Sequence, residues 1–180
     1  VFAASPNNPP TIMQLHGDST LYRAGDGLEI LDQWTVATVS DIDSPNFANG
    51  RLTVQVAVNA VAAEEQISIA DEGTGAGQIG INGGANVTYA GVQIGAYTWN
   101  AAGRVFTVDF NADATPVAVS RLIQRMQYQN LNPTATVAVR TIRFTVNDGE
   151  GGTSGFSDVV GDVHAGDVLK TAIDALHGSN

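Results

Sequence analysis

The chain has 180 residues, with 18 acidic and 8 basic side chains, a formal net charge of -10 and no cysteine. Too few cations are present to neutralise a phosphate backbone or an anionic membrane surface, so neither nucleic acid nor such a membrane is an expected partner. Disulfide bonds, thiolate metal sites and thiol nucleophiles are excluded. No apolar run approaches the roughly 20 residues that a membrane helix needs, and the N-terminus resembles no signal peptide.

The first ten residues are expected to form a linker, because Pro6, Pro9 and Pro10 cannot join a central sheet ladder. Beyond them, short alternating runs bounded by turn residues predict strands. The clearest run is 51–58, where every second residue is Leu or Val. The predicted strands cover residues 28–31, 34–39, 51–58, 66–70, 87–90, 92–97, 105–110, 137–146 and 156–163.

Two segments predict helices instead. Thr115 and Pro116 provide an N-cap and a first-turn proline, and an apolar stripe at helical spacing follows as far as Met126. A second stripe begins at His164 and ends before Gly178, which predicts a C-terminal helical tail over 164–180.

Two further patterns qualify the strand assignment. Residues 71–86 are rich in glycine and predict a wide loop or a weak hairpin. The phase of alternation changes within 137–146, which predicts a bulge or a strand buried on both faces. Strands recurring every 8–12 residues or so predict an all-β sandwich over 11–163 with one short inserted helix.

Two aspartates, Asp41 and Asp43, follow a predicted strand and lie two positions apart. In an extended segment at that spacing both carboxylates point to the same side, where they repel each other. A hard cation such as Ca²⁺ removes this repulsion, and Asn46 and Asn49 are able to add oxygen ligands. A polar turn with local hydrogen bonds explains the same residues, so both interpretations stay open.

Two more acids are weaker candidates for the same cation. Asp148 lies within Asn147-Asp148-Gly149, which is sufficient as a hairpin turn but could supply a third carboxylate. Asp26 is flanked by glycines, and a simple turn accounts for it.

Three segments resemble cadherin-type repeats. Residues 41–54 (DIDSPNFANGRLTV) resemble their Asp-x-Asp-Ser…Asn-Gly segment, 144–149 (FTVNDG) resembles the segment near the end of a repeat, and 7–11 (NNPPT) resembles the linker between repeats. The inserted helix and the Thr-rich strand after it are closer to the cadherin-like repeats of large bacterial surface and secreted proteins. The resemblance covers about residues 8–163.

This resemblance implies an Ig/cadherin-like sandwich that binds Ca²⁺ through Asp41, Asp43 and Asp148. It also implies an extracellular or cell-surface location, as a structural or adhesive repeat of a larger bacterial protein. The expected partners are neighbouring repeats or a cell-surface or glycan receptor. The chain departs from the family at Asn8, where the linker carries no aspartate, and at Ala24, where bacterial relatives carry an acid.

Enzymatic activity is not expected. The three histidines, His16, His164 and His177, lack metal-ligand spacing, and no nucleophile motif is present. Glu64 and Glu65 are expected to be solvated acids at a strand edge.

Two alternatives to a calcium-binding repeat remain. In a carbohydrate-binding module, Trp99 is the candidate ligand-binding residue, because it is expected in an exposed loop over 98–103, whereas Trp34 is expected in the core. A self-assembling surface-layer or virion component is the other alternative, since the predicted C-terminal helix suggests self-association.

Overall fold

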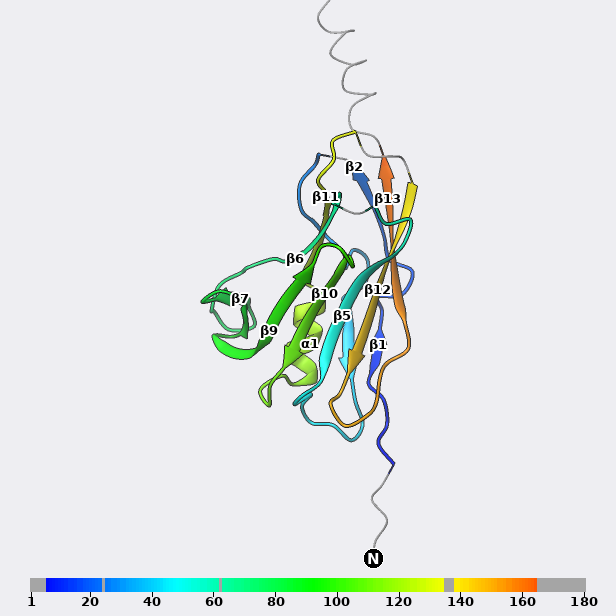
Figure 1. The fold of residues 1–180 in the computed structure, drawn as a ribbon. Coiled ribbons are helices and arrows are strands. Elements are labelled where there is room, and N and C mark those ends of the chain that lie inside the picture. The colour runs from blue at the N-terminus through cyan, green and yellow to red at the C-terminus, as the bar shows by residue number, and fades with distance from the viewer. Residues whose placement is uncertain (1–5, 24, 62, 135–137, 165–180) are drawn as a thin grey trace, which may run out of the picture.

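Strands are the predominant secondary structure of the described chain, which in this computed structural model comprises residues 6–23, 25–61, 63–134 and 138–164 (Figure 1). The elements in chain order are β1 (Thr11–Met13), β2 (Ser19–Arg23), β3 (Glu29–Ile30), β4 (Thr38–Ser40), β5 (Arg51–Val58), β6 (Glu65–Ile69), β7 (Ile79–Asn82), β8 (Asn86–Tyr89), β9 (Val92–Asn100), β10 (Val105–Phe110), α1 (Pro116–Ile123), β11 (Met126–Asn130), β12 (Ala138–Asn147) and β13 (Ser157–His164). The predicted tail over 164–180 lies outside the described residues, except that His164 ends β13.

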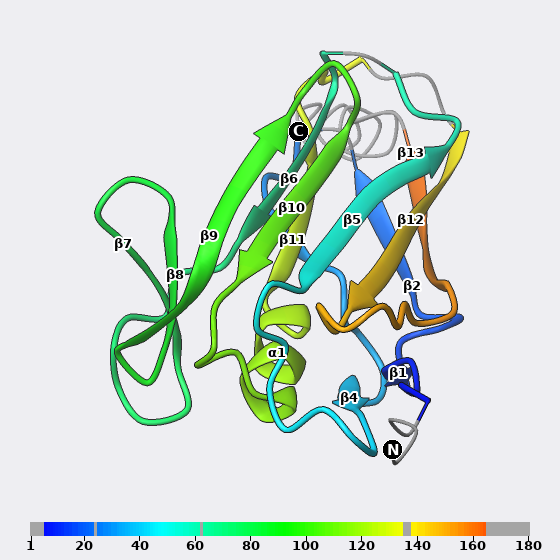
Figure 2. The ribbon, with the colours of Figure 1, turned by 60° about the horizontal axis from the view of Figure 1, so that its bottom comes forward.

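The strands form two layers. One layer is an eight-stranded sheet in the order β2-β13-β12-β5-β10-β9-β8-β7, antiparallel except for the β2–β13 pair. The other layer contains the three-stranded sheet β3-β11-β6, the pair β1-β4 and α1. Figure 2 shows β9, β10, β5 and β12 of the large sheet in front of β6 and β11. The fold is therefore the predicted all-β sandwich with one short helix.

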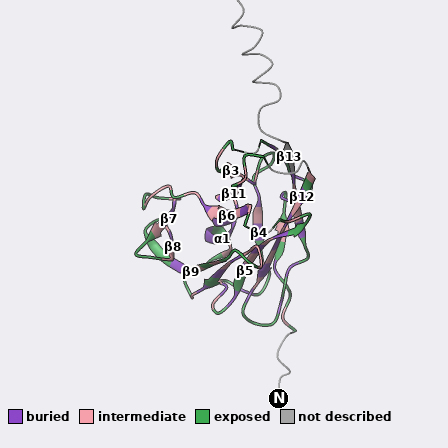
Figure 3. Ribbon diagram, turned by 45° about the horizontal axis from the view of Figure 1, so that its top comes forward, coloured by how far each residue is buried: buried purple, intermediate pink, exposed green. Residues whose placement is uncertain are grey.

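Alternation of apolar residues explains the central strands. Along β5, β10 and β12 every second side chain is buried between the layers, and the others face outward (Figure 3). This is the pattern of a strand with one face in the core. The change of phase predicted within β12 was wrong, because its even-numbered residues from Arg140 to Val146 are all buried. The register between β12 and β5 does shift beside Thr141 and Ile142, but the extra residue there is Ala57 of β5.

The inserted helix is also confirmed. The side chain of Thr115 accepts a hydrogen bond from the Ala118 N–H, which caps the first turn. The apolar stripe of α1 faces the core, and Leu122 and Ile123 are fully buried. The helix ends sooner than predicted, because Met126 begins β11 instead of completing another turn.

Several strand predictions were wrong in extent. Only Thr38–Ser40 forms a strand in the segment predicted as 34–39, and Trp34, predicted in the core, is 74 % exposed. The buried Asp18 carboxylate accepts hydrogen bonds from the Trp34 and Gln33 amides and holds this loop out of the sheet. The strands β1, β2, β7 and β11 were not predicted, although the hairpin β7–β8 matches the weak hairpin expected near 71–86.

The two layers are joined by an ion pair in the core. Arg140 of β12 and Glu65 of β6 have fully buried side chains, and the guanidinium Nε lies 3.0 Å from Glu65 Oε1. Arg140 Nη1 also donates to the Ala138 carbonyl. The prediction that Glu65 is solvated was therefore wrong, because its charge is balanced by a partner 75 residues away.

Two tyrosines extend this network. The Tyr128 hydroxyl donates to Glu65 Oε2, and the Tyr22 hydroxyl donates to the Asn130 carbonyl. The two rings pack edge to face with centroids 5.2 Å apart. Burial, reinforced by the hydrogen bond to Glu65, raises the pKa of Tyr128, and burial raises that of Tyr22. Both hydroxyls therefore stay protonated and act as donors.

We expect Arg140→Met to destabilise the domain by about 3–5 kcal/mol, because it leaves Glu65 as an unpaired buried charge. The double variant Arg140→Met/Glu65→Gln should recover part of this loss, since the charge is removed and Tyr128 keeps an acceptor. Urea unfolding measures both free energies.

Arg143→Met is the matched control. Arg143 lies on the same strand but faces outward, where it pairs with a partly exposed Asp158 at 2.8 Å. Such pairs contribute up to about 1 kcal/mol. Equal losses for Arg140→Met and Arg143→Met would contradict a structural role for the buried pair.

Candidate functional site

The linker before β1 packs against two loops at one end of the sandwich. Pro10 is buried, and Thr11 pairs with Ser40, so the linker enters beside the loop that follows β4. Asn7 Nδ2 donates to Asp148 Oδ2 at 2.8 Å. The Asn8 side chain and backbone N–H both donate to Asp43 Oδ2, at 2.9 and 3.0 Å. The two asparagines thus connect segments that are far apart in the sequence.

The Asp41–Ser44 segment forms a compact polar turn. Asp41 Oδ1 accepts hydrogen bonds from the Asp43 and Ser44 amides at 3.0 and 2.9 Å. This local arrangement is the turn that the sequence allowed as an alternative to a cation site. It occupies only one oxygen of Asp41, and it places Asp43 at the surface beside the linker.

Asp148 organises the loop after β12 from a fully buried position. Its Oδ1 accepts from the Glu150 and Gly152 amides at 2.7 and 2.9 Å, while Oδ2 accepts from Asn7. A Cβ built on Gly152 would clash with Asp148 Oδ2, so only glycine permits this close approach. Both oxygens of Asp148 are thus engaged by the protein itself.

Several buried oxygens at this end have no hydrogen-bond partner within the described chain. They are Asn7 Oδ1, Asp41 Oδ2 and the hydroxyl of Ser44, a residue that is only 2 % exposed. A buried acceptor without a partner costs free energy, and native proteins usually supply a donor, a water or an ion. Oxygen atoms of carboxylates, amides and hydroxyls are the ligand type that Ca²⁺ prefers, so the residues fit this ion.

The other predicted ligands lie elsewhere or are differently engaged. Asp26 follows β2 at the opposite end of the sandwich and is exposed. Asn49 has a positive φ of 63°, and its side chain lines a pocket on the outer face of β5. Asn46 Oδ1 accepts from the Ala48 amide. Among the described residues, no group of three or more His, Cys, Asp and Glu side chains gathers closely enough to hold a metal.

Any cation at this end would therefore need a mixed set of carboxylate and amide oxygens. Asn7 and Asn8, which connect the two loops, were predicted only as linker residues. Two side-chain amides beside a run of prolines are the signal that could have identified them.

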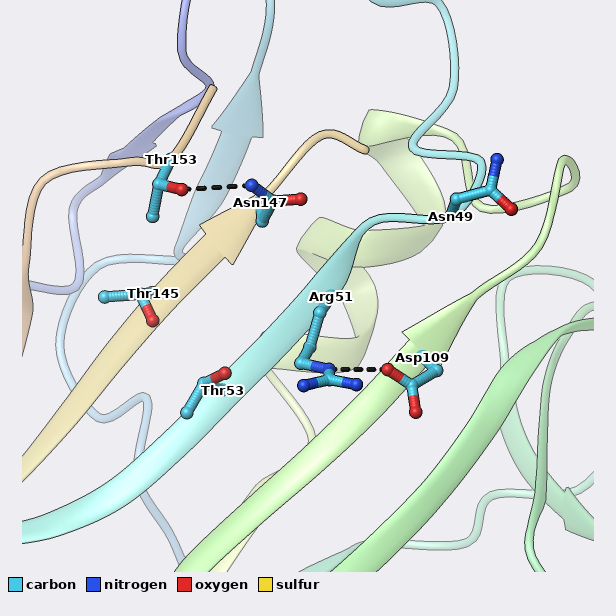
Figure 4. Close-up of a pocket in the computed structure, with 7 residues that line it drawn as sticks. All are labelled: Asn49, Arg51, Thr53, Asp109, Thr145, Asn147 and Thr153. Atoms are coloured by element: carbon cyan, nitrogen blue, oxygen red, sulfur yellow. Dashed lines mark hydrogen bonds and ion pairs between the residues drawn. The ribbon is translucent and has the colours of Figure 1, made fainter. Parts of the chain in front are cut away.

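The outer-face pocket is polar and has a volume of about 360 Å³. Arg51 and Asp109 form an ion pair of 2.5 Å within it, and the hydroxyls of Thr53 and Thr145 lie beside them (Figure 4). This pocket was not anticipated from the sequence.

Trp99, the predicted glycan-contacting residue, does not line this pocket. It lies in β9, so its predicted position in a loop was wrong. Its partly buried ring borders an apolar cavity of about 250 Å³ together with Tyr97, Phe106 and residues of β6.

Hydrogen bonds from Asn8 lower the pKa of the Asp43 carboxyl below its ordinary value of 3.8. The associated stabilisation is complete above the ordinary pKa and is lost as the pH falls through the lowered one. We expect Asn8→Ala to return the pKa of Asp43 towards 3.8. A carboxyl-carbon NMR titration measures both values, and an unchanged pKa in Asn8→Ala would contradict the assigned cause.

Comparison with known proteins adds no relative. No family model, no curated protein and no solved structure matches the chain. In the described part of the chain, no helix is long and apolar enough to cross a membrane.

Proposed function

We propose that the chain is a calcium-binding structural or adhesive repeat of a larger extracellular protein. The observation that carries the proposal is the set of buried oxygens without partners at the end where the linker packs, those of Asn7, Asp41 and Ser44. A divalent cation there would satisfy these atoms and offset the negative charge of Asp41 and Asp43.

Some residues of the site would bind the ion, and one would position a ligand. Asp41, Asp43 and Asn7 would supply oxygens to the ion. Asp148 has no oxygen left over, and its role would be to position Asn7 through the 2.8 Å hydrogen bond. The remaining ligands would come from backbone carbonyls and water, as is usual for the six to eight oxygens around calcium.

The consequence for the molecule would be a fixed linker. Asn7 and Asn8 already connect the linker to two loops, and an ion on the same residues would hold the preceding domain at one angle. An extracellular location suits such a site, because weak calcium sites with dissociation constants of about 10⁻⁴–10⁻³ M are filled there. The resemblance to cadherin-like repeats supports the same assignment, including a bacterial cell surface.

The test is thermal unfolding in EDTA and in millimolar Ca²⁺. At about 10 mM Ca²⁺ the ion is in about ten- to hundredfold excess over such a dissociation constant, which adds about 1.4–2.7 kcal/mol and raises the Tm of a domain of this size by about 3–10 °C. Asp41→Asn should abolish most of this rise in Tm. The variant keeps the side-chain oxygen that accepts the two hydrogen bonds of the turn, so the turn itself should stay intact. Asp26→Asn, at the opposite end, is the control and should keep the rise. A wild-type Tm that is independent of Ca²⁺ would refute the proposal.

A further inference from the structure

The outer face of the eight-stranded sheet carries an ordered array of polar side chains. Thr98, Thr107, Thr53 and Thr145 are paired in register across β9, β10, β5 and β12, which makes a row of hydroxyls. The neighbouring row contains Asp109, Arg51 and Asn147, again directly paired. In Figure 2 these strands face the viewer, and the second layer lies behind them.

The pocket in this array combines donors and acceptors without net charge. Arg51 and Asp109 neutralise each other, although their side chains are 54 % and 57 % exposed. The remaining lining comprises threonine hydroxyls and the amides of Asn49 and Asn147. Each hydroxyl both donates and accepts, and an amide does the same through two atoms. A neutral ligand with many hydroxyl groups matches this pattern, whereas an anion would meet the field of a chain with charge -10.

The lining is held rigidly. Arg51, Thr53, Asp109, Thr145 and Asn147 all lie on strands whose register is set by both neighbours. Asn147 is fixed further, since its Nδ2 donates to the Gly152 carbonyl and to the Thr153 hydroxyl at the rim (Figure 4). Side chains fixed on strands can select among sugar stereoisomers better than loop residues can.

A peptide fits the pocket less well. The central strand, β5, is paired on both sides by β12 and β10, so it offers no free edge to an added strand. No large apolar side chain lines the pocket to receive a peptide anchor.

We propose that this pocket is a glycan subsite that binds one or two neutral sugar rings. Its volume of about 360 Å³ lies at the lower end of the range for small-ligand sites. Because no aromatic ring lines it, the subsite is weak by itself, with a dissociation constant of about 1 mM. Several copies in tandem raise the avidity for a polymer.

The experiment is an amide NMR titration of the full chain, in EDTA, with maltose, cellobiose, lactose, chitobiose and mannobiose. We expect saturable shifts at residues 51–53, 109 and 145–147 with at least one of these sugars. Thr53→Val and Thr145→Val keep the shape of the side chain and should each weaken binding about fivefold. Thr98→Val is the matched control, because Thr98 belongs to the same row but lies outside the pocket.

Three outcomes would overturn the inference. They are no saturable shift with any of the five disaccharides, equal affinity in the Thr53→Val and wild-type chains, and shifts at 51–53 that appear only in a parallel titration with the anionic sugar sialyllactose. A matching Tm for each variant establishes that it is folded. Since EDTA is present throughout, the outcome is independent of calcium binding at the linker end.

Discussion

The buried ion pair between Arg140 and Glu65 is the interaction on which the two-layer arrangement depends. Arg140 belongs to the eight-stranded sheet and Glu65 to the three-stranded one, so the pair forms only when both sheets take their native places. A slip of β12 by one residue would turn Arg140 outward and leave Glu65 as a buried charge, a cost of several kcal/mol. The register shift beside Thr141 lies next to this pair, and β5 absorbs it with the extra residue Ala57, so β12 keeps one alternation from Arg140 to Val146.

The sequence predicted correctly those elements that depend on neighbouring residues only. The alternation along β5 and β10 and the cap at Thr115 are visible in the sequence because one buried face and one capping hydroxyl suffice to define them. The strand β11 (MQYQN) was missed because the polar Asn130 and the hydroxyl-bearing Tyr128 are buried in it by partners far away in the chain. The error at Trp34 was the reverse, because an apolar residue that was predicted to be buried is exposed. The Asp18 carboxylate accepts a hydrogen bond from the Trp34 amide and keeps its side chain in solvent.

The same limit applies to the candidate sites. The Asp41 turn is local and could be foreseen, whereas the bond between Asn7 and Asp148 spans 141 residues. The polar pocket depends on which residue of β5 lies opposite which residue of β10 and β12. This cross-strand register cannot be read from a single sequence. Arg51 and Asp109 were therefore visible only as members of two separate strands. The pocket and the linker-end site use different faces of the same loop, since Asn147 lines one and Asp148 organises the other.

The described chain enters at one end of the sandwich and leaves at the other (Figure 1). A pull on its two ends would therefore act along the strands. The last strand, β13, pairs with β12 through seven residues and with β2 through five, so these hydrogen bonds would be sheared together. The first strand, β1, has three residues, and its anchoring is shared with the contacts of Asn7 and Asn8. Because fewer paired residues hold the linker end, we expect it to yield under tension before β13 does.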